Sequence, residues 1–279
     1  MISRNIKILL VSLFLSIGFW WGIDVSSESL ANFVFQRETG MHPVMFAAQL
    51  AQEELTLELV YARTARNSVI PLELQAPSAL SVFVDKTGGE KVLFRKNSDA
   101  PMPIASLTKL MTALVAVKTY EIDREVSMSL AILAEQGDMG YLKIEDVFTV
   151  RDLVYLLLME SSNDAAAALA EVMGKESFVA LMNKEARNLG LSNTFFVNPT
   201  GLDPEVLGEP GNYSTSEDLV KFAVYISSNY PHLFDILSLE TFDITNSKGE
   251  FHHTMINTNA ILNWSEWPTK ILGGKTGWT

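Results

Sequence analysis

The sequence contains no cysteine, and this absence limits its chemistry. Without thiols the chain forms neither disulfides nor thiolate metal sites, and an oxidising compartment poses no thiol problem for it. Basic residues are also scarce, because 21 Lys and Arg stand against 33 Asp and Glu, which gives a formal net charge of −12. A nucleic-acid partner would require a basic face, so we expect no nucleic acid among the partners.

Histidine is scarce too, and its placement argues against a metallopeptidase. The 4 histidines are His42, His232, His252 and His253, and none belongs to a His-Glu-x-x-His motif of the kind that binds zinc. We predict neither a metal nor another cofactor. The adjacent His252 and His253 are interpreted as polar surface, because neighbours in an extended chain point to opposite faces.

The first residues have the basic-then-apolar order of a targeting segment. Arg4 and Lys7 precede an apolar run from Ile8 to Ile23, which Asp24 ends. Such a segment directs the rest of the chain across the cytoplasmic membrane. Residues 6–23 are either part of a cleaved signal peptide or a retained membrane anchor, and both alternatives stay open. We expect the protein at the periplasmic or extracellular face of the membrane.

Composition divides the chain into three parts. With 279 residues, 48% of them hydrophobic, the chain is long enough to bury one large core. The signal peptide or membrane anchor occupies residues 1–23. Residues 24–75 are interpreted as a spacer that carries a helix between Pro43 and Arg66. The remaining residues, 76–279, are predicted to form the folded domain.

The start of this domain has the pattern of a β-hairpin followed by a helix. Residues 80–84 and 91–94 are strand-like and flank the loop Asp85–Glu90, whose glycines suit a tight turn. A helix is predicted from about Ile104 to Lys118, because its apolar residues follow the i, i+3, i+4 spacing of a buried stripe.

Further signals place a second pair of helices and a last strand. Thr149 and Asp152 have the spacing of a capping pair that opens a helix over 150–159. Asp164 is predicted to cap the alanine-rich helix that follows. Residues 271–278 are interpreted as a strand whose glycines let another backbone or a ligand come close.

Three short motifs carry the chemistry. Ser106-Leu107-Thr108-Lys109 puts a hydroxyl and an amine on one helical face, because residues i and i+3 are neighbours there. A serine hydroxyl becomes a good nucleophile when an adjacent base takes its proton, and the Lys109 amine is within reach. Ser161-Ser162-Asn163 and Lys275-Thr276-Gly277 follow in chain order. A second Lys-Thr-Gly, at Lys86, is assigned to the hairpin turn instead.

In type and order these motifs resemble those of the low-molecular-mass penicillin-binding proteins that act as D-alanyl-D-alanine carboxypeptidases. The resemblance covers roughly Ala76 to Thr279 and extends to residues 103–113, to much of 182–202 and to Asn257-Thr258-Asn259. It implies an α+β fold of the β-lactamase/transpeptidase type. In such a fold an antiparallel sheet is flanked by helices, and a mostly helical subdomain carries the Ser-x-Asn motif.

The resemblance also implies catalytic roles. Ser106 would attack the carbonyl between two D-alanines of a peptidoglycan stem peptide, and Lys109 would take its proton. Ser161 would relay a proton to the leaving amine, and Asn163 would orient Lys109. Lys275 would be the second cation that keeps Lys109 neutral.

Substrate binding would fall to the last motif. Thr276, Gly277 and Trp278 are the predicted substrate-binding residues, and the backbone N–H groups of Ser106 and Trp278 would form an oxyanion hole. Penicillins would acylate Ser106 for the same reason as the substrate, because β-lactams mimic the D-Ala-D-Ala dipeptide.

The sequence departs from the family pattern in two places. Ser162 stands where the family commonly has glycine. The chain also ends two residues after Gly277, where the family continues with two strands and a helix. We therefore expect the catalytic domain to be incomplete at its C-terminus.

Three alternative functions stay open. A DD-endopeptidase on the same scaffold would cut cross-links instead of terminal residues. A class A β-lactamase would add a glutamate that activates water, but no Glu-x-x-Leu-Asn lies between Asn163 and Lys275, where only Glu205 and Glu209 occupy a proline- and glycine-bounded loop. The third alternative is a non-catalytic binder of cell-wall peptide.

Overall fold

The computed structural model describes residues 74–134, 141–204, 209–263 and 271–277. From Gln75 onward these residues belong to one compact unit. The predicted targeting segment and nearly all of the predicted spacer lie outside the described residues. Among the helices that are described, none is long and apolar enough to cross a membrane.

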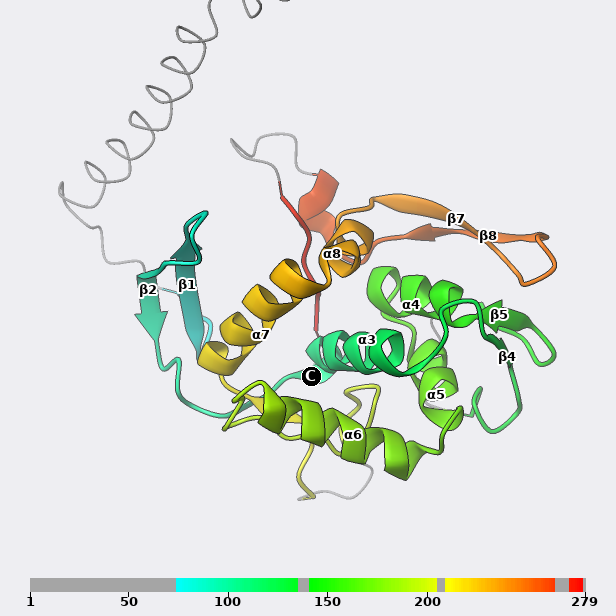
Figure 1. Cartoon of the computed structure of the whole chain (residues 1–279), viewed down its shortest axis with the longest axis horizontal. Helices are drawn as coiled ribbons and strands as arrows, with labels where there is room; N and C mark the ends of the chain where they lie inside the picture. The colour runs from blue at the N-terminus through cyan, green and yellow to red at the C-terminus, as the bar shows by residue number, and fades with distance from the viewer. Residues whose placement is uncertain (1–73, 135–140, 205–208, 264–270, 278–279) are drawn as a thin grey trace, which may run out of the picture. The chain divides into compact units, whose positions relative to one another are not determined.

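Short strands and longer helices alternate along the described chain (Figure 1). The strands are β1 (Ala79–Val84), β2 (Glu90–Lys96), β3 (Met102–Pro103), β4 (Glu125–Ser127), β5 (Val147–Thr149), β6 (Tyr213–Ser214), β7 (Thr241–Thr245) and β8 (Phe251–Ile256). The helices are α3 (Thr108–Thr119), α4 (Val150–Met159), α5 (Asn163–Glu171), α6 (Lys175–Asn188), α7 (Ser216–Asn229) and α8 (Pro231–Leu237), with the 3₁₀ turns η1 (Ala105–Leu107) and η2 (Ala260–Asn263).

The α+β class predicted from the sequence is confirmed, but the strands do not form one continuous sheet. Within the described residues they pair antiparallel in four two-stranded sheets, β1–β2, β3–β6, β4–β5 and β7–β8. The last segment, 271–277, has no strand assignment, so the strand predicted over 271–278 is not observed in its described part. A strand needs a hydrogen-bonded neighbour, and none is assigned to this segment.

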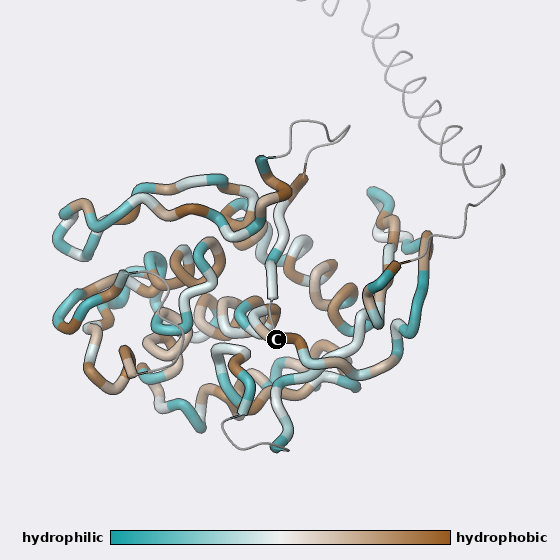
Figure 2. Tube along the Cα trace, turned by 180° about the vertical axis from the view of Figure 1, so that it is seen from behind, coloured by the Kyte–Doolittle hydropathy of each residue, from teal (hydrophilic) through white to brown (hydrophobic). Residues whose placement is uncertain are grey.

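The core lies around α3, which contacts α4, α5 and α6 (Figure 1). Its fully buried residues on α3 and α4 include Met111, Leu114, Leu153 and Leu157. The helical subdomain that was predicted to carry the Ser-x-Asn motif contains α4 and α5. The motif lies where α4 ends and α5 begins. By contrast, the loop at the tip of the β7–β8 hairpin is hydrophilic (Figure 2).

The helix caps agree with the prediction for α4 and differ for α5. Thr149 accepts a hydrogen bond from the backbone of Asp152, whose carboxylate in turn accepts one from Thr149 N, so the predicted capping box is confirmed. For α5 the cap is Ser162, whose Oγ accepts from Ala165 N at 3.1 Å. The prediction of Asp164 was wrong because the helix begins two residues earlier than assumed, so that Asp164 lies in its first turn.

The predicted helix over 104–118 begins differently as well. Pro103 belongs to β3, residues 105–107 form the 3₁₀ turn η1, and regular α-helix begins only at Thr108. Ser106 therefore lies in η1, one turn ahead of α3, and not within the α-helix itself.

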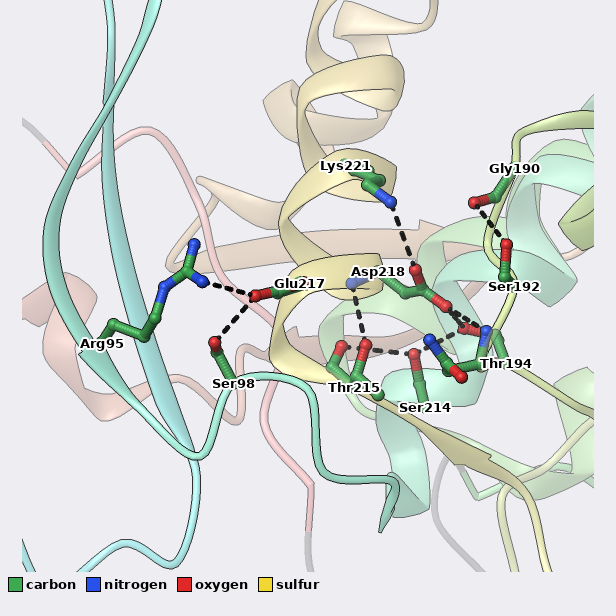
Figure 3. A network of polar contacts seen from close by, with 11 residues as sticks. Arg95, Ser98, Gly190, Ser192, Thr194, Ser214, Thr215, Glu217, Asp218 and Lys221 are labelled. Atoms are coloured by element: carbon green, nitrogen blue, oxygen red, sulfur yellow. Dashed lines mark hydrogen bonds and ion pairs between the residues drawn. The ribbon is translucent and has the colours of Figure 1, made fainter.

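Helix α7 is fixed to its neighbours by buried and half-buried polar groups (Figure 3). The buried carboxylate of Asp218 accepts from Asn193 N at 2.8 Å and from Thr194 Oγ1 at 2.9 Å. Glu217 accepts from Ser98 Oγ at 2.9 Å and pairs with Arg95 at 3.1 Å. These contacts join β2 and the segment after α6 to the start of α7. That segment continues into the loop that contacts the candidate site.

Candidate active site

The turn that carries Ser106 is held in an unusual backbone conformation. Ala105, the residue before it, has φ +44°, in the left-handed region that disfavours side chains. Gly201 packs directly against this turn, and a Cβ at position 201 would overlap the Ala105 carbonyl oxygen. Gly201 has φ +86° itself, so two features of its position require glycine. The close contact fixes where Ser106 lies at the start of α3.

Lys109 lies one turn after Ser106 and is completely buried. Its Nζ is 3.0 Å from Ser106 Oγ, 2.8 Å from Asn163 Oδ1 and 2.6 Å from the Thr200 carbonyl oxygen. A neutral amine has two N–H groups and one lone pair. If Asn163 and Thr200 accept the two N–H groups, the lone pair is left for the Ser106 hydroxyl proton.

The electrostatic setting favours that neutral amine. Burial, reinforced by the positive charge of Lys275, lowers the pKa of Lys109 to about 7. A lysine in water stays protonated to well above this pH. The Lys109 amine is therefore able to accept a proton near neutral pH.

Ser161 lies in the short connection between α4 and α5, and Asn163 is the first residue of α5. Ser161 has φ +62°, again in the left-handed region, and this turn separates the two helices. Lys275 Nζ donates to Ser161 Oγ at 2.9 Å and to the Thr276 carbonyl oxygen at 2.9 Å. Burial lowers the pKa of Lys275 to about 8. Of the two lysines, Lys109 therefore loses its proton first and Lys275 keeps its charge longer.

The last described segment runs past the Ser106 turn. A Cβ at Gly277 would lie 3.3 Å from Ile104 O and 3.6 Å from Ser106 N, so little space separates the two backbones. Thr276 Oγ1 is 2.8 Å from Thr258 Oγ1. The predicted substrate-binding residue Trp278 lies outside the described residues, whereas Gly277 lies beside the serine backbone.

A buried network of asparagines supports the loop that meets Lys109. Asn212 Nδ2 donates to Thr108 Oγ1 at 2.8 Å and to Asn198 O at 2.9 Å. Asn198 Oδ1 accepts from Gly201 N at 2.7 Å. The sequence analysis did not identify Asn212 or Thr200 as site residues. The sequence shows only that these two residues are polar and flank a glycine- and proline-rich loop. A role of a backbone carbonyl, such as that of Thr200, cannot be predicted from the residue type.

The structure also shows the second Lys-Thr-Gly motif and the adjacent histidines, to which no catalytic role was assigned. Lys86 lies in the turn between β1 and β2, where Gly88 has φ +82°. Within the described residues no group of three or more His, Asp or Glu side chains is arranged to hold a metal ion. The prediction that His252 and His253 point apart was wrong, because their Nδ1 atoms are 2.7 Å from each other.

Comparison with known proteins places this geometry in a class. Residues 65–279 match the family model of the D-alanyl-D-alanine carboxypeptidases. The chain therefore belongs to this family. It is 33% identical over 214 residues to the D-alanyl-D-alanine endopeptidase of Pseudomonas aeruginosa, with 75% of this chain and 66% of that protein covered. It is 31% identical over 214 residues to the D-alanyl-D-alanine carboxypeptidase DacF of Bacillus subtilis, with 74% and 52% covered.

Solved structures agree with this assignment. A D-alanyl-D-alanine carboxypeptidase from Mycobacterium tuberculosis matches with a TM-score of 0.67 at 28% identity, covering 77% of both chains. Penicillin-binding protein D2 from Listeria monocytogenes, in its cefotaxime-bound form, matches with a TM-score of 0.62 at 30% identity, covering 75% of this chain and 81% of that one. The predicted penicillin-binding-protein fold is confirmed. The chain spans less than two thirds of the length of the curated relatives described above.

Proposed function

We propose that this chain is the catalytic domain of a serine-type D-Ala-D-Ala carboxypeptidase that removes the terminal D-alanine from peptidoglycan stem peptides. The observation that carries the proposal is the Ser106–Lys109 pair. Its two side-chain polar atoms are 3.0 Å apart, and burial lowers the pKa of the lysine to about 7. A nucleophile beside a base that is neutral at the working pH is what acyl transfer requires.

In the first step Ser106 Oγ attacks the carbonyl carbon between the two D-alanines. The hydroxyl proton passes to Lys109 Nζ as the new C–O bond forms. Negative charge develops on the carbonyl oxygen, where the Ser106 N–H and, by family resemblance, the Trp278 N–H would stabilise it. One donor of this kind typically contributes about a hundredfold to a thousandfold to the rate.

In the second step the C–N bond breaks and the leaving D-alanine amine takes a proton. Ser161 is suited to deliver it, because its Oγ is 2.9 Å from the Lys275 ammonium, which can replace the proton given up. Water then attacks the acyl-enzyme carbonyl, and the proton it loses returns through Ser161 to Lys275. Ser106 Oγ takes its proton back from Lys109 as the ester bond breaks. The shortened stem peptide is released.

The carboxylate of the terminal D-alanine would bind at the last motif. Lys275 offers a positive charge and Thr276 a hydroxyl, and both belong to the segment that passes close to the Ser106 turn at Gly277. β-Lactams carry a carboxylate and a strained amide in the same relation, so we expect them to acylate Ser106. The proposed location is the outer face of the cytoplasmic membrane, with residues 1–23 as signal peptide or anchor and 24–75 as spacer.

Covalent labelling tests the assignment of the nucleophile. We expect intact mass spectrometry to show one penicillin attached to the wild-type protein and none to Ser106→Ala. Ser192→Ala, at an exposed position, is the matched control and should label normally. Covalent attachment to a folded Ser106→Ala protein would contradict the proposal. Release of free D-alanine from a tripeptide ending in D-Ala-D-Ala separates an enzyme from a non-catalytic binder.

An endopeptidase activity is the second candidate, because the Pseudomonas aeruginosa relative and one from Escherichia coli, 31% identical over 211 residues, carry that name. Digestion of cross-linked and uncross-linked muropeptides distinguishes the two activities. Loss of terminal D-alanine from the uncross-linked peptide identifies a carboxypeptidase, and cleavage confined to the cross-link identifies an endopeptidase. Rapid turnover of nitrocefin would instead identify a β-lactamase.

A further inference from the structure

A row of four titratable side chains lies next to the candidate site without belonging to it. His252 Nε2 is 3.3 Å from Asp146 Oδ2, the two histidine Nδ1 atoms are 2.7 Å apart, and His253 Nε2 is 3.0 Å from Glu160 Oε2. All four side chains are largely buried, with exposed fractions between 11% and 21%. We refer to Asp146, His252, His253 and Glu160 as the imidazole row.

A β-bulge explains why both rings lie together. In the β7–β8 pair His253 is opposite Ile244 and Phe251 is opposite Thr245, so His252 is an extra residue without a partner. An inserted residue re-aims side chains that would otherwise alternate between faces. The hairpin also lies against the first half of the domain, because Ser247 N donates to Val147 O at 2.8 Å (Figure 1).

All contacts of the imidazole row are satisfied by three protons on its four ring nitrogens. Each Nε2 faces a carboxylate, so each carries a proton and donates it. The two Nδ1 atoms face each other, so one must carry a proton and the other must accept it. Three protons on four ring nitrogens make the pair one imidazolium and one neutral imidazole. With a fourth proton, the N–H groups of both Nδ1 atoms would point at each other. Without the shared proton, the lone pairs of both Nδ1 atoms would point at each other.

The row ends at the candidate site. Glu160 is the C-cap residue of α4 and directly precedes Ser161. Beyond His253, strand β8 leads to Thr258, whose N–H donates to Met159 O at 3.0 Å and whose hydroxyl contacts Thr276. The β7–β8 hairpin is thus bonded to both sides of the Ser161–Lys275 contact.

We propose that the imidazole row is a positioning device that holds Ser161 against Lys275 and does so only while the two histidines share a single proton. The inference rests on the proposed function, in which Ser161 delivers a proton to the leaving group. His253 is a positioning residue here, because it acts on Ser161 through Glu160.

The surroundings supply few competing charges. The titratable groups that contact the two rings within the described residues are the carboxylates of Asp146 and Glu160 and the phenol ring of Tyr141, edge-on to His253 at 5.4 Å between centroids. From strand β5 the apolar ring of Phe148 lies edge-on to His252. On β7 the nearest carboxylate, Asp243, accepts from Thr254 Oγ1 at 2.7 Å.

The kinetic test compares two substitutions of His253 in the full chain. His253→Phe removes the contact with Glu160, and we expect penicillin acylation to slow by about tenfold to a hundredfold, the range that a misplacement of about 1 Å produces. His253→Gln keeps an N–H for Glu160 and should recover most of the rate at pH 7. His232→Gln, on exposed α8 surface, is the control.

These outcomes separate positioning from mere stability. Thermal unfolding is measured for each variant. A folded His253→Phe protein that acylates at the wild-type rate overturns the inference, as do Phe and Gln variants that are equally slow at every pH. Since all variants keep Lys109, its titration cancels in the ratio to wild type.

The proton count is tested without catalysis. Spectra of protein labelled with nitrogen-15 in histidine should show, at pH 7, both Nε2 atoms protonated and one proton shared between the two Nδ1 atoms. Two neutral rings or two fully protonated rings would overturn the inference. A wild-type protein that is not acylated at all but shows the shared proton would instead refute the proposed function.

Discussion

At the scale of single residues, the site depends on one lysine that is neutral and one that is charged. Lys109 is surrounded by Asn163 Oδ1, the Thr200 carbonyl and Ser106 Oγ. Three acceptors around one amine suit a protonated lysine as well as a neutral one, so geometry alone does not decide its charge. Burial and the charge of Lys275 do, because both lower its pKa. Without burial and the nearby charge, Lys109 would stay protonated, and the same contacts would be those of a structural ammonium group.

The two lysines predict a bell-shaped pH dependence of acylation. The rate should rise as Lys109 loses its proton around pH 7 and fall as Lys275 loses its proton around pH 8. Because the groups interact, the two limbs belong to the pair. In Lys275→Met the charge that helps to lower the pKa of Lys109 is gone, so the acid limb should move to higher pH and the alkaline limb should disappear. Rates of acylation measured from pH 5 to 10 give the profile, and an unshifted acid limb would contradict the assignment.

Among the described glycines, Gly201 leaves the least space for a side chain. Gly201→Ala puts a Cβ into the Ala105 carbonyl at a backbone φ of +86°. We expect a loss of about 3 kcal/mol or more in unfolding free energy, from overlap added to strain, together with loss of acylation. Gly190→Ala is the matched control, since Gly190 has φ +69° but nothing within 4 Å of the added Cβ.

The Gly190→Ala control separates the effect of steric overlap with Ala105 from the effect of backbone strain at positive φ. Gly190→Ala should lose about 1 kcal/mol from the left-handed backbone alone and keep its activity. Denaturant unfolding of both variants measures the difference. Equal losses would mean that the Ala105–Gly201 contact does not constrain the Ser106 turn.

At the scale of elements, the sequence predicted what short-range chemistry decides. Helix α4 was placed to the residue because the Thr149–Asp152 capping box acts within one turn. The bulge at His252 and the start of α3 were missed, since both depend on distant partners. The bulge depends on the register between β7 and β8, and the η1 turn depends on Gly201, far along the chain. The same holds for the Thr200 carbonyl, which no side-chain pattern marks.

The cap of α5 gives a prediction at this scale. Ser162 is fully buried and its Oγ accepts from Ala165 N. Ser162→Ala should lower the unfolding free energy by about 1 kcal/mol, whereas Ser162→Gly should lower it by only a few tenths, as for N-caps in general. Both should keep acylation, because Ser161 and Asn163 are unchanged. Equilibrium unfolding resolves the two, and an alanine variant as stable as wild type would show that the cap contributes nothing.

At the scale of the whole molecule, the fold brings four distant stretches of chain to one buried polar site. Ser106 comes from η1 and Lys109 from the start of α3. Asn163 comes from the start of α5, Thr200 from the loop before β6, and Lys275 from the last described segment. Each motif alone can be explained by a purely structural role, as a helix cap or a turn. Their convergence around the buried Lys109 and the half-buried Lys275 is what the order of motifs along the sequence predicted, through family resemblance and not through periodicity.

Burying these lysines should make the stability of the whole domain depend on pH. A lysine titrates near 10.5 when unfolded, but Lys109 does so at about 7 in the fold. Between these values the unfolded chain binds more protons, so the unfolding free energy rises with pH across this window and the gain is lost as pH falls toward 7. From pH 7.5 to 9.5 the contribution of Lys109 is about 2 kcal/mol.

Lys109→Met removes this contribution while filling a similar volume. Its unfolding free energy, measured with denaturant at both pH values, should rise less than that of wild type by that amount. Lys184→Met, at an exposed position, should follow wild type, which separates the burial of one amine from the general effect of pH on an acidic protein. If all three proteins respond alike, Lys109 is charged in the folded state at pH 7.5, and an acyl transfer that begins with proton uptake by Lys109 is excluded.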